Sequence, residues 1–246
     1  MAGRRVAHPS AQSVAGAAAA RVTCRTPEPE GDVTYRGPVH ALATGLLVAA
    51  GVSAVGNWIA VARHSSVGIY VCKPLTLVLM IGAALALDPT SEAMRTWFVI
   101  ALVLSLLGDV FLMLPSDAFV AGLTAFLLAH VAYIVGLNQD SAGNWWFAVP
   151  VVVLAAFLGR RLIAGIRRSG QPEMVVPVVA YVVTILVMVA SAVASGNAVA
   201  AAGALLFMTS DAFIGGDRFV THRSWQPMTI MVTYHVAQAL FVLSLV

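Results

Sequence analysis

Long apolar blocks follow one another from residue 40 to residue 246, and short polar breaks separate them. A helix needs about 20 mainly apolar residues to cross ~30 Å of hydrocarbon, because it rises about 1.5 Å per residue. Most of the blocks approach that length, so the pattern predicts eight transmembrane helices. They are expected at residues 40–62, 69–87, 97–114, 118–137, 145–163, 174–194, 198–215 and 227–246.

The breaks between the blocks carry residues that favour turns. They include Asp88-Pro89, Pro115-Ser116-Asp117 and Gly215-Gly216. The fifth block is the weakest, because its apolar run stops at Gly159, just before Arg160 and Arg161. We expect these two long side chains to reach the membrane surface while the helix itself remains in the bilayer.

Composition agrees with a bilayer as the solvent of this chain. Its 246 residues are 60% hydrophobic and 10% charged, and the mean hydropathy is +0.89. A soluble domain is about 45–50% apolar and about 25% charged. We therefore predict an all-α polytopic membrane protein, placed in a cell membrane and expected to be bacterial.

Charge is sparse, and most charged residues lie in the loops and the N-terminal tail. The net charge is +3, which indicates membrane orientation rather than binding to nucleic acid. Arginines crowd the breaks after the fifth and seventh blocks. With eight spans these breaks share one side, and the positive-inside rule makes that side cytoplasmic.

Residues 1–38 differ from the rest of the chain. They contain several arginines and prolines and an alanine-rich stretch. A signal peptide is one interpretation, but residues 11–20 include Gln12 and Ser13 and no leucine, which makes a weak hydrophobic region. We predict a mostly disordered polar tail at 1–38 and an eight-helix transmembrane domain at 39–246.

The two halves of the apolar region resemble each other. Residues 106–109 match 208–211, residues 130–133 match 235–238, and Pro74 and Pro177 precede the two aspartates at similar spacing. A true four-plus-four repeat would relate the halves by an axis along the membrane normal. Chance matches among apolar helices are the alternative interpretation.

Ionisable side chains lie inside the predicted spans, where each costs at least about 2.5–3.5 kcal/mol. Such groups usually face the bundle interior and pair with one another. The ionisable residues are Lys73, Asp109, His130, Asp211 and His235, and their polar neighbours include Asn57, Tyr133, Tyr181, Ser210, Tyr234 and Gln238.

Each of these residues also has a structural interpretation. Lys73 could form a buried ion pair, and the aspartates could lie at the membrane interface. The histidines could join helices by hydrogen bonds. The tyrosines, Asn57 and Gln238 are more often structural than catalytic.

Two carboxyl groups from different helices suit acid–base hydrolysis, if one holds a proton and a neighbouring lysine keeps the other ionised. No G-x-S-x-G or H-E-x-x-H motif is present in the sequence. A zinc site from His130, His235 and an aspartate is possible on ligand type alone. We predict neither a metal nor another cofactor.

At these residues the sequence resembles the YhhN-like lysoplasmalogenase family of membrane proteins. The resemblance covers most of residues 40–246. The segments that show the resemblance are residues 73–75, 105–109, 125–133, 203–211 and 234–238. Ala129 departs mildly from the glycine often found before the histidine, and residues 1–38 have no counterpart.

The resemblance implies eight helices and an ether hydrolase that cleaves the vinyl-ether bond of a lysoplasmalogen. The lysophospholipid substrate would yield a fatty aldehyde and a glycerophospho-ethanolamine or -choline. Asp109 and Asp211 are the hypothesised catalytic pair, and Lys73 would tune one of them or contact the phosphate. The alternatives are a proton-coupled small-molecule transporter, a zinc-dependent membrane lipid hydrolase, and a lipid-binding membrane protein without turnover.

Overall fold

The structure is a computed structural model that describes residues 38–139, 146, 149–168 and 170–246. Within these residues there are eight α-helices, the short 3-10 helix η2 and no strand, so the all-α prediction is confirmed. The predicted tail at 1–38 falls almost entirely outside them. The elements are α1 (Pro38–Ala62), α2 (Ser66–Ala86), α3 (Glu92–Met113), α4 (Phe119–Leu137), α5 (Val149–Arg168), η2 (Pro172–Met174), α6 (Val175–Ala194), α7 (Ala198–Phe219) and α8 (Gln226–Leu243).

Six helices of the described chain are long and apolar enough to cross a membrane, so this is a multi-pass integral membrane protein. They are α1, α2, α3, α4, α6 preceded by η2, and α7. The predicted count of eight spans is not confirmed. The two remaining helices are less apolar, because α5 ends in an arginine-rich half and the 18-residue α8 carries Tyr234, His235 and Gln238.

Helix α7 corrects one predicted break. It continues through Gly215-Gly216 to Phe219, so Asp217 and Arg218 lie in its last turns rather than in a loop. The glycine serves packing here, since a Cβ on Gly215 would lie only 3.2 Å from the Leu162 side chain of α5. Similarly, α5 continues past the predicted end at residue 163 and stops at Arg168.

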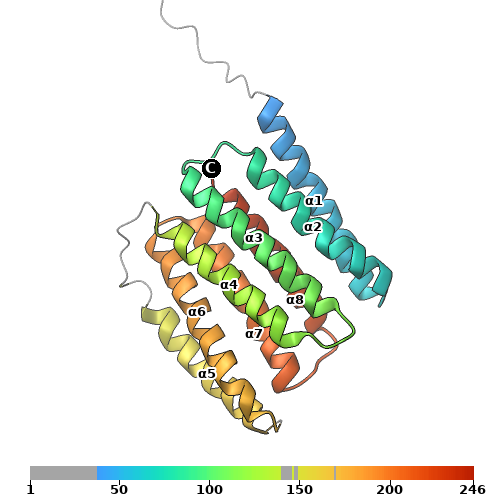
Figure 1. Ribbon diagram of the computed structural model, residues 1–246, viewed down its shortest axis with the longest axis vertical. Coiled ribbons are helices and arrows are strands. Elements are labelled where there is room, and N and C mark those ends of the chain that lie inside the picture. Colours follow the sequence, from blue (N-terminus) through green and yellow to red (C-terminus); the bar gives the residue numbers. More distant parts are fainter. Residues whose placement is uncertain (1–37, 140–145, 147–148, 169) are drawn as a thin grey trace, which may run out of the picture. The chain divides into compact units, whose positions relative to one another are not determined.

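Consecutive helices pack in pairs, and α8 lies among the other pairs (Figure 1). Helix α1 packs on α2, α3 on α4, and α7 on α8. Helix α8 also contacts α1, α2 and α3, while α6 contacts α4, α5 and α7. The polar side chains of α8 therefore face helices from the first half of the chain.

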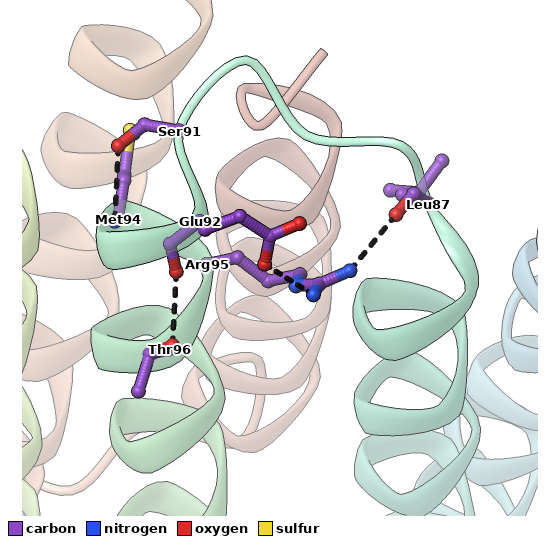
Figure 2. Close-up of polar contacts among 6 residues, drawn as sticks. All are labelled: Leu87, Ser91, Glu92, Met94, Arg95 and Thr96. Carbon is purple, nitrogen blue, oxygen red and sulfur yellow. Dashed lines mark hydrogen bonds and ion pairs between the residues drawn. The ribbon is translucent and has the colours of Figure 1, made fainter.

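The break between α2 and α3 is fixed by side-chain contacts (Figure 2). Ser91 caps α3 by accepting a hydrogen bond from the backbone N–H of Met94 at 3.3 Å. Arg95 donates to the carbonyl oxygen of Leu87 at 3.2 Å and pairs with Glu92. These contacts hold the end of α2 against the start of α3 and so help to set their register.

Aromatic side chains fill the middle of the bundle. Tyr133 stacks on Phe241 with ring centroids 4.1 Å apart, and Phe98 contacts both rings edge-on. Phe207 lies beside Tyr133 on the α7 side. All four rings are buried. They form a packed aromatic layer in the bundle.

Candidate active site

Asp109 lies in a closed polar network at the junction of α2, α3 and α8. The Lys73 Nζ atom is 3.0 Å from Oδ1 of Asp109, and the Tyr234 hydroxyl donates to Oδ2 at 2.8 Å. Only 2% of the Asp109 side chain is exposed. Gly108 allows α4 to pack closely here, because a Cβ would lie 2.6 Å from the Phe126 ring. The result is a buried ion pair with a further hydrogen-bond donor.

Asp211 has different partners at the junction of α4, α6 and α7. The Tyr181 hydroxyl donates to Oδ2 of Asp211 at 3.0 Å, and the His130 Nε2 atom lies 3.4 Å from the same oxygen. His130 carries a charge only when protonated, and its Nε2 makes no hydrogen bond among the described residues, so this carboxyl accepts a hydrogen bond from a phenol and lies beside an imidazole rather than a permanent cation. Its side chain is 6% exposed.

The two carboxyl groups share one scheme of contacts. Each aspartate is on the third helix of its half of the chain. Each has one partner from the second helix of its own half and one from the fourth helix of the other half. A four-plus-four repeat about an axis along the membrane normal would produce this scheme.

Aromatic rings connect the two networks. The Phe207 ring is 5.5 Å from that of Tyr234, which binds Asp109, and 4.7 Å from that of His130, which contacts Asp211. The Phe126 ring also contacts Tyr234, at 5.9 Å.

A cavity of about 250 Å³ lies beside Asp211, with walls from α3, α4, α5, α6 and α7. Among the described residues its only polar side chains are Tyr181, Asp211 and Arg161, and the rest of the wall is apolar or glycine. Phe126 belongs to this wall, but Asp109 does not. One of the two predicted catalytic carboxyls therefore faces an apolar cavity, and the other lies behind aromatic side chains.

The remaining predicted site residues do not join one network, and two of them form a pair. The Tyr133 hydroxyl donates to Oε1 of Gln238. Ser210 donates to the backbone carbonyl of Ile230 at 3.2 Å, so it joins α7 to α8. Asn57 is fully buried, and its amide has no partner among the described residues.

Sequence reasoning missed Trp58, which donates its indole N–H to Nδ1 of His235 at 3.1 Å. The signal was present, because Trp58 lies within the first predicted span and a buried indole N–H usually has a partner. This bond ties His235 to α1, whereas His130 contacts Asp211. Among the described residues no three histidine, cysteine or acidic side chains are placed to hold a metal ion.

Comparison with known proteins places these residues in a family. The sequence model described as the YhhN family matches residues 68–245. The chain belongs to the YhhN family. The match includes both aspartates and every partner of theirs described above, whereas Asn57 and Trp58 precede it.

Several curated relatives of this YhhN-family chain carry the name lysoplasmalogenase. Lysoplasmalogenase TMEM86B of Homo sapiens is 34% identical over 144 residues, which are 58% of this chain and 61% of the human protein. Lysoplasmalogenase of Mycobacterium tuberculosis is 31% identical over 172 residues, which are 67% of this chain and 66% of that protein. The chain thus spans slightly less than two thirds of each. No solved structure matches it.

Proposed function

We propose that this protein hydrolyses the vinyl-ether bond of a lysoplasmalogen, releasing a fatty aldehyde and a glycerophospho-ethanolamine or -choline. The observation that carries the proposal is the buried carboxyl of Asp211 in the wall of an apolar cavity, connected through the rings of His130, Phe207 and Tyr234 to the ion-paired Asp109. The human and mycobacterial relatives named lysoplasmalogenase support it.

The cavity suits a lipid with one hydrocarbon chain. Its wall is apolar except near Tyr181, Asp211 and Arg161. A pocket of this kind binds the chain by burial of apolar surface and uses a few polar groups to orient the reacting bond. The chain of a lysolipid would occupy the apolar part and bring its vinyl-ether group to Asp211.

In the first step Asp211 is the proton donor. The vinyl π electrons form a C–H bond at the β-carbon with the proton of the Asp211 carboxyl, and an oxygen lone pair completes an oxocarbenium ion. Asp211 is left as a carboxylate, which accepts the hydrogen bond of Tyr181. Asp109 stays ionised beside Lys73, and its negative charge stabilises the cation across the aromatic layer.

In the second step water attacks the α-carbon and its released proton passes to a carboxylate. Buried polar groups without a hydrogen-bond partner among the described residues lie near both carboxyl groups: the Ser105 hydroxyl and His235 Nε2 near Asp109, and Nε2 of His130 beside Asp211. Ser105 lies one turn from Asp109, and His235 follows Tyr234. Ordered water usually satisfies such groups, and the attacking water gives its proton to the carboxylate that faces the cavity, which is that of Asp211.

The resulting hemiacetal then breaks its bond to the glycerol oxygen. The Asp211 carboxyl, reprotonated by the attacking water, gives this proton to the leaving glycerol oxygen and accepts the proton of the hemiacetal hydroxyl as the aldehyde forms. One water is consumed, and no oxidant or reductant is needed. The carboxyl groups return to their starting states, because each proton taken from water or hydroxyl replaces one that was given.

The proposal is tested by aldehyde release from lysoplasmalogen by the purified full chain in detergent. We expect Asp211→Asn and Asp109→Asn each to lower the rate at least about a hundredfold, the usual scale for loss of an acid or base. The matched control is Asp88→Asn, which changes an exposed carboxylate in the α2–α3 connection. Full activity in both test variants would reject the carboxylate pair.

The transporter alternative makes a different prediction. Carriers of that kind usually have discontinuous helices at the substrate site. In the described residues α2 runs unbroken through Pro74, and Pro177 lies in the first turn of α6. Uptake into liposomes that depends on a pH gradient, without lipid turnover, would favour a transporter over the hydrolase.

A further inference from the structure

Among the described residues, three glycines belong to the wall of the apolar cavity: Gly159 of α5, and Gly215 and Gly216 of α7. The two glycines of α7 have neighbours that a side chain would meet. A Cβ on Gly215 would lie 3.2 Å from the Leu162 side chain, and one on Gly216 would lie 3.7 Å from Nε2 of Gln226. Gly159 differs, because a Cβ there would have no described atom within 4 Å.

The backbone gives no reason for a glycine at position 159. Gly159 lies inside the regular helix α5, and its φ is not positive, in contrast to those of Gly170 and Gly196. Glycine is among the least favourable residues in a helix interior, because its backbone loses the most freedom there. The described surroundings therefore give Gly159 neither a conformational role nor a packing role, and its consequence is the space that it leaves.

This space lies on the inner face of α5. Gly159 precedes Leu162 by three residues and Ile166 by seven, and residues so spaced share one face of a helix. Ile166 is fully buried, and Leu162 packs against the same small apolar cluster. A side chain at position 159 would therefore extend into the bundle rather than into the lipid.

Two close contacts between α5 and α7 show how these helices are aligned. Leu162 lies against Gly215, and Gly165 lies against Phe219, where a Cβ on Gly165 would be 2.8 Å from the carbonyl oxygen. Residue numbers rise together along the two contacts. The two helices therefore run in the same direction.

The same alignment places Gly159 at the level of Asp211. Asp211, Gly215 and Phe219 are spaced by four residues and share one face of α7. One turn before Leu162 is Gly159, and one turn before Gly215 is Asp211. Both residues belong to the cavity wall. The space left at Gly159 thus lies at the level of the carboxyl that the proposed reaction uses.

The α6 side of the cavity is made of larger side chains. Tyr181, Val182 and Ile185 belong to this wall. Tyr181 donates to Asp211, and Ile185 follows one turn later and is buried. The width of the cavity beside Asp211 is therefore set by bulky side chains on α6 and by a residue without a side chain on α5.

From this juxtaposition we infer that Gly159 is a specificity-determining residue, which leaves room beside Asp211 for the first carbons of the lysolipid hydrocarbon chain. The inference rests on the proposed function and extends it by naming the residue that sets the width of the substrate space. An unbranched chain has a narrow cross-section and fits beside a glycine. A side chain at position 159 takes that volume, and packed sites tolerate extra methyl groups poorly.

The first measurement is of binding and does not require hydrolysis. A fluorescent lysophospholipid bound to the full chain in detergent is displaced by a 1-O-alkyl-glycerophosphocholine, which has no vinyl bond to cleave. We expect the affinity for the alkyl ligand to fall with the size of the new side chain. The loss should stay within about threefold for Gly159→Ala and reach at least about tenfold for Gly159→Phe. Unchanged affinity in Gly159→Phe would overturn the inference.

Gly51→Phe is the matched control. A Cβ on Gly51 also has no described atom within 4 Å, but this residue is exposed on α1 and does not belong to the cavity wall. The control should bind like the unchanged protein. Unfolding in mixed detergent is measured on the same preparations, and its midpoint should not fall in Gly159→Ala, since alanine favours a helix more than glycine does.

Two results of these controls would contradict the inference. One is a similar loss of affinity in Gly51→Phe, which would indicate a general effect of an added ring on the protein in detergent. The other is a loss in the Gly159 variants that follows their unfolding midpoints rather than the size of the side chain.

The second measurement tests specificity with an alkyl ligand that carries a methyl branch on its third carbon, directly beyond the two carbons that correspond to the vinyl group. The branch and the methyl group of Gly159→Ala would compete for the same space. We therefore expect this variant to lose at least about fivefold more affinity for the branched ligand than for the unbranched one. A structural role of Gly159 predicts equal losses for both ligands, and that result would overturn the inference.

Rates of aldehyde release separate this inference from the proposed function. If the unchanged protein hydrolyses lysoplasmalogen and Gly159→Phe has the same kcat/KM, the role of Gly159 is wrong and the hydrolase proposal stands. If no variant and not even the unchanged protein releases aldehyde, but the affinities still follow the size of residue 159, the hydrolase proposal is wrong and the role of Gly159 in binding the chain stands.

Discussion

The two buried carboxyl groups have related positions in the fold and different surroundings. Asp109 is held by a lysine and a phenol in a closed network between α2, α3 and α8. Asp211 accepts a hydrogen bond from a phenol, lies beside an imidazole and faces an apolar cavity. The comparison shows that two similar arrangements of helices can contain different sites, one with a fixed ion pair and one that borders a cavity.

The different surroundings of the two carboxyl groups suggest different roles, one mainly in stability and one mainly in function. A buried ion pair is costly to break, because removing one partner leaves an uncompensated charge away from water. Asp211 has no such fixed countercharge among its contacts described above, and it is the carboxyl that a ligand can reach. Loss of either aspartate should lower turnover, but we expect substitutions of the partners of Asp109 to act mainly on folding and substitutions of the partners of Asp211 to act mainly on turnover.

The largest expected effect is that of Lys73→Met. This change keeps the length of the side chain but leaves the Asp109 carboxylate buried without its cation, which should lower the free energy of unfolding by about 3–5 kcal/mol. Unfolding in mixed detergent, followed by tryptophan fluorescence, measures this change.

Two further variants sharpen the Lys73 result. Arg63→Met removes a cation at the exposed end of α1 and should have little effect. Lys73→Met/Asp109→Leu removes both charges and should recover much of the lost stability, since buried ion pairs are often replaceable by apolar groups. If the double variant is no more stable than Lys73→Met, the stabilising role of the pair is wrong.

Much of the fold followed from the apolar pattern. Helices α1, α2, α4 and α6 begin and end within about three residues of the prediction, because apolar length and turn residues both mark the ends of spans. The pattern failed at Gly215-Gly216, where a residue pair typical of turns serves helix packing instead. It also failed at the end of α5, which continues beyond the predicted end at residue 163 to Arg168.

The candidate site was only partly predictable. The free-energy cost of placing an ionisable side chain inside a membrane identified Lys73, Asp109, His130 and Asp211 as residues that need partners. It did not assign the pairs, because the sequence does not determine which helices lie side by side. The cavity at Asp211 was beyond sequence reasoning for the same reason, since its wall comes from five helices.

The second prediction compares the two tyrosines that donate to the carboxyl groups. Tyr181→Phe should lower kcat about tenfold or more, because the Asp211 carboxylate formed after proton transfer loses a donor. Its unfolding free energy should change little. Tyr234→Phe should instead lower the unfolding free energy by about 1–3 kcal/mol, since the buried Asp109 carboxylate is left short of a hydrogen bond.

The control for both tyrosines is Tyr70→Phe, whose side chain belongs to α2 and is about half exposed. It should change neither quantity. Aldehyde release and detergent unfolding are measured on the same preparations. Equal effects of Tyr181→Phe and Tyr234→Phe on both quantities would remove the distinction between the two carboxyl sites.

The smallest expected effect lies at the rim of the Asp211 cavity, where Arg218 lies over the ring of Phe119, a residue of the cavity wall. The Arg218 guanidinium holds the pKa of the Asp117 carboxyl below its usual value by donating a hydrogen bond to it. Both side chains are substantially exposed, so the pair contributes little. Asp117→Asn removes it without added strain, because asparagine tolerates the positive φ of 50° at this position.

The sign of the pH dependence follows from that lowered pKa. The pair stabilises the folded protein above the unfolded pKa of aspartate, about 3.9, and this contribution is lost as pH falls through the lower pKa of the folded state. The difference in Tm between the unchanged protein and Asp117→Asn should therefore be small but measurable at pH 7 and low salt, and it should close as the medium becomes more acid than about pH 4. If the difference in Tm persists unchanged to pH 3, Asp117 acts through its backbone conformation rather than through its charge. The ion pair with Arg218 would then not contribute to the stability of the rim.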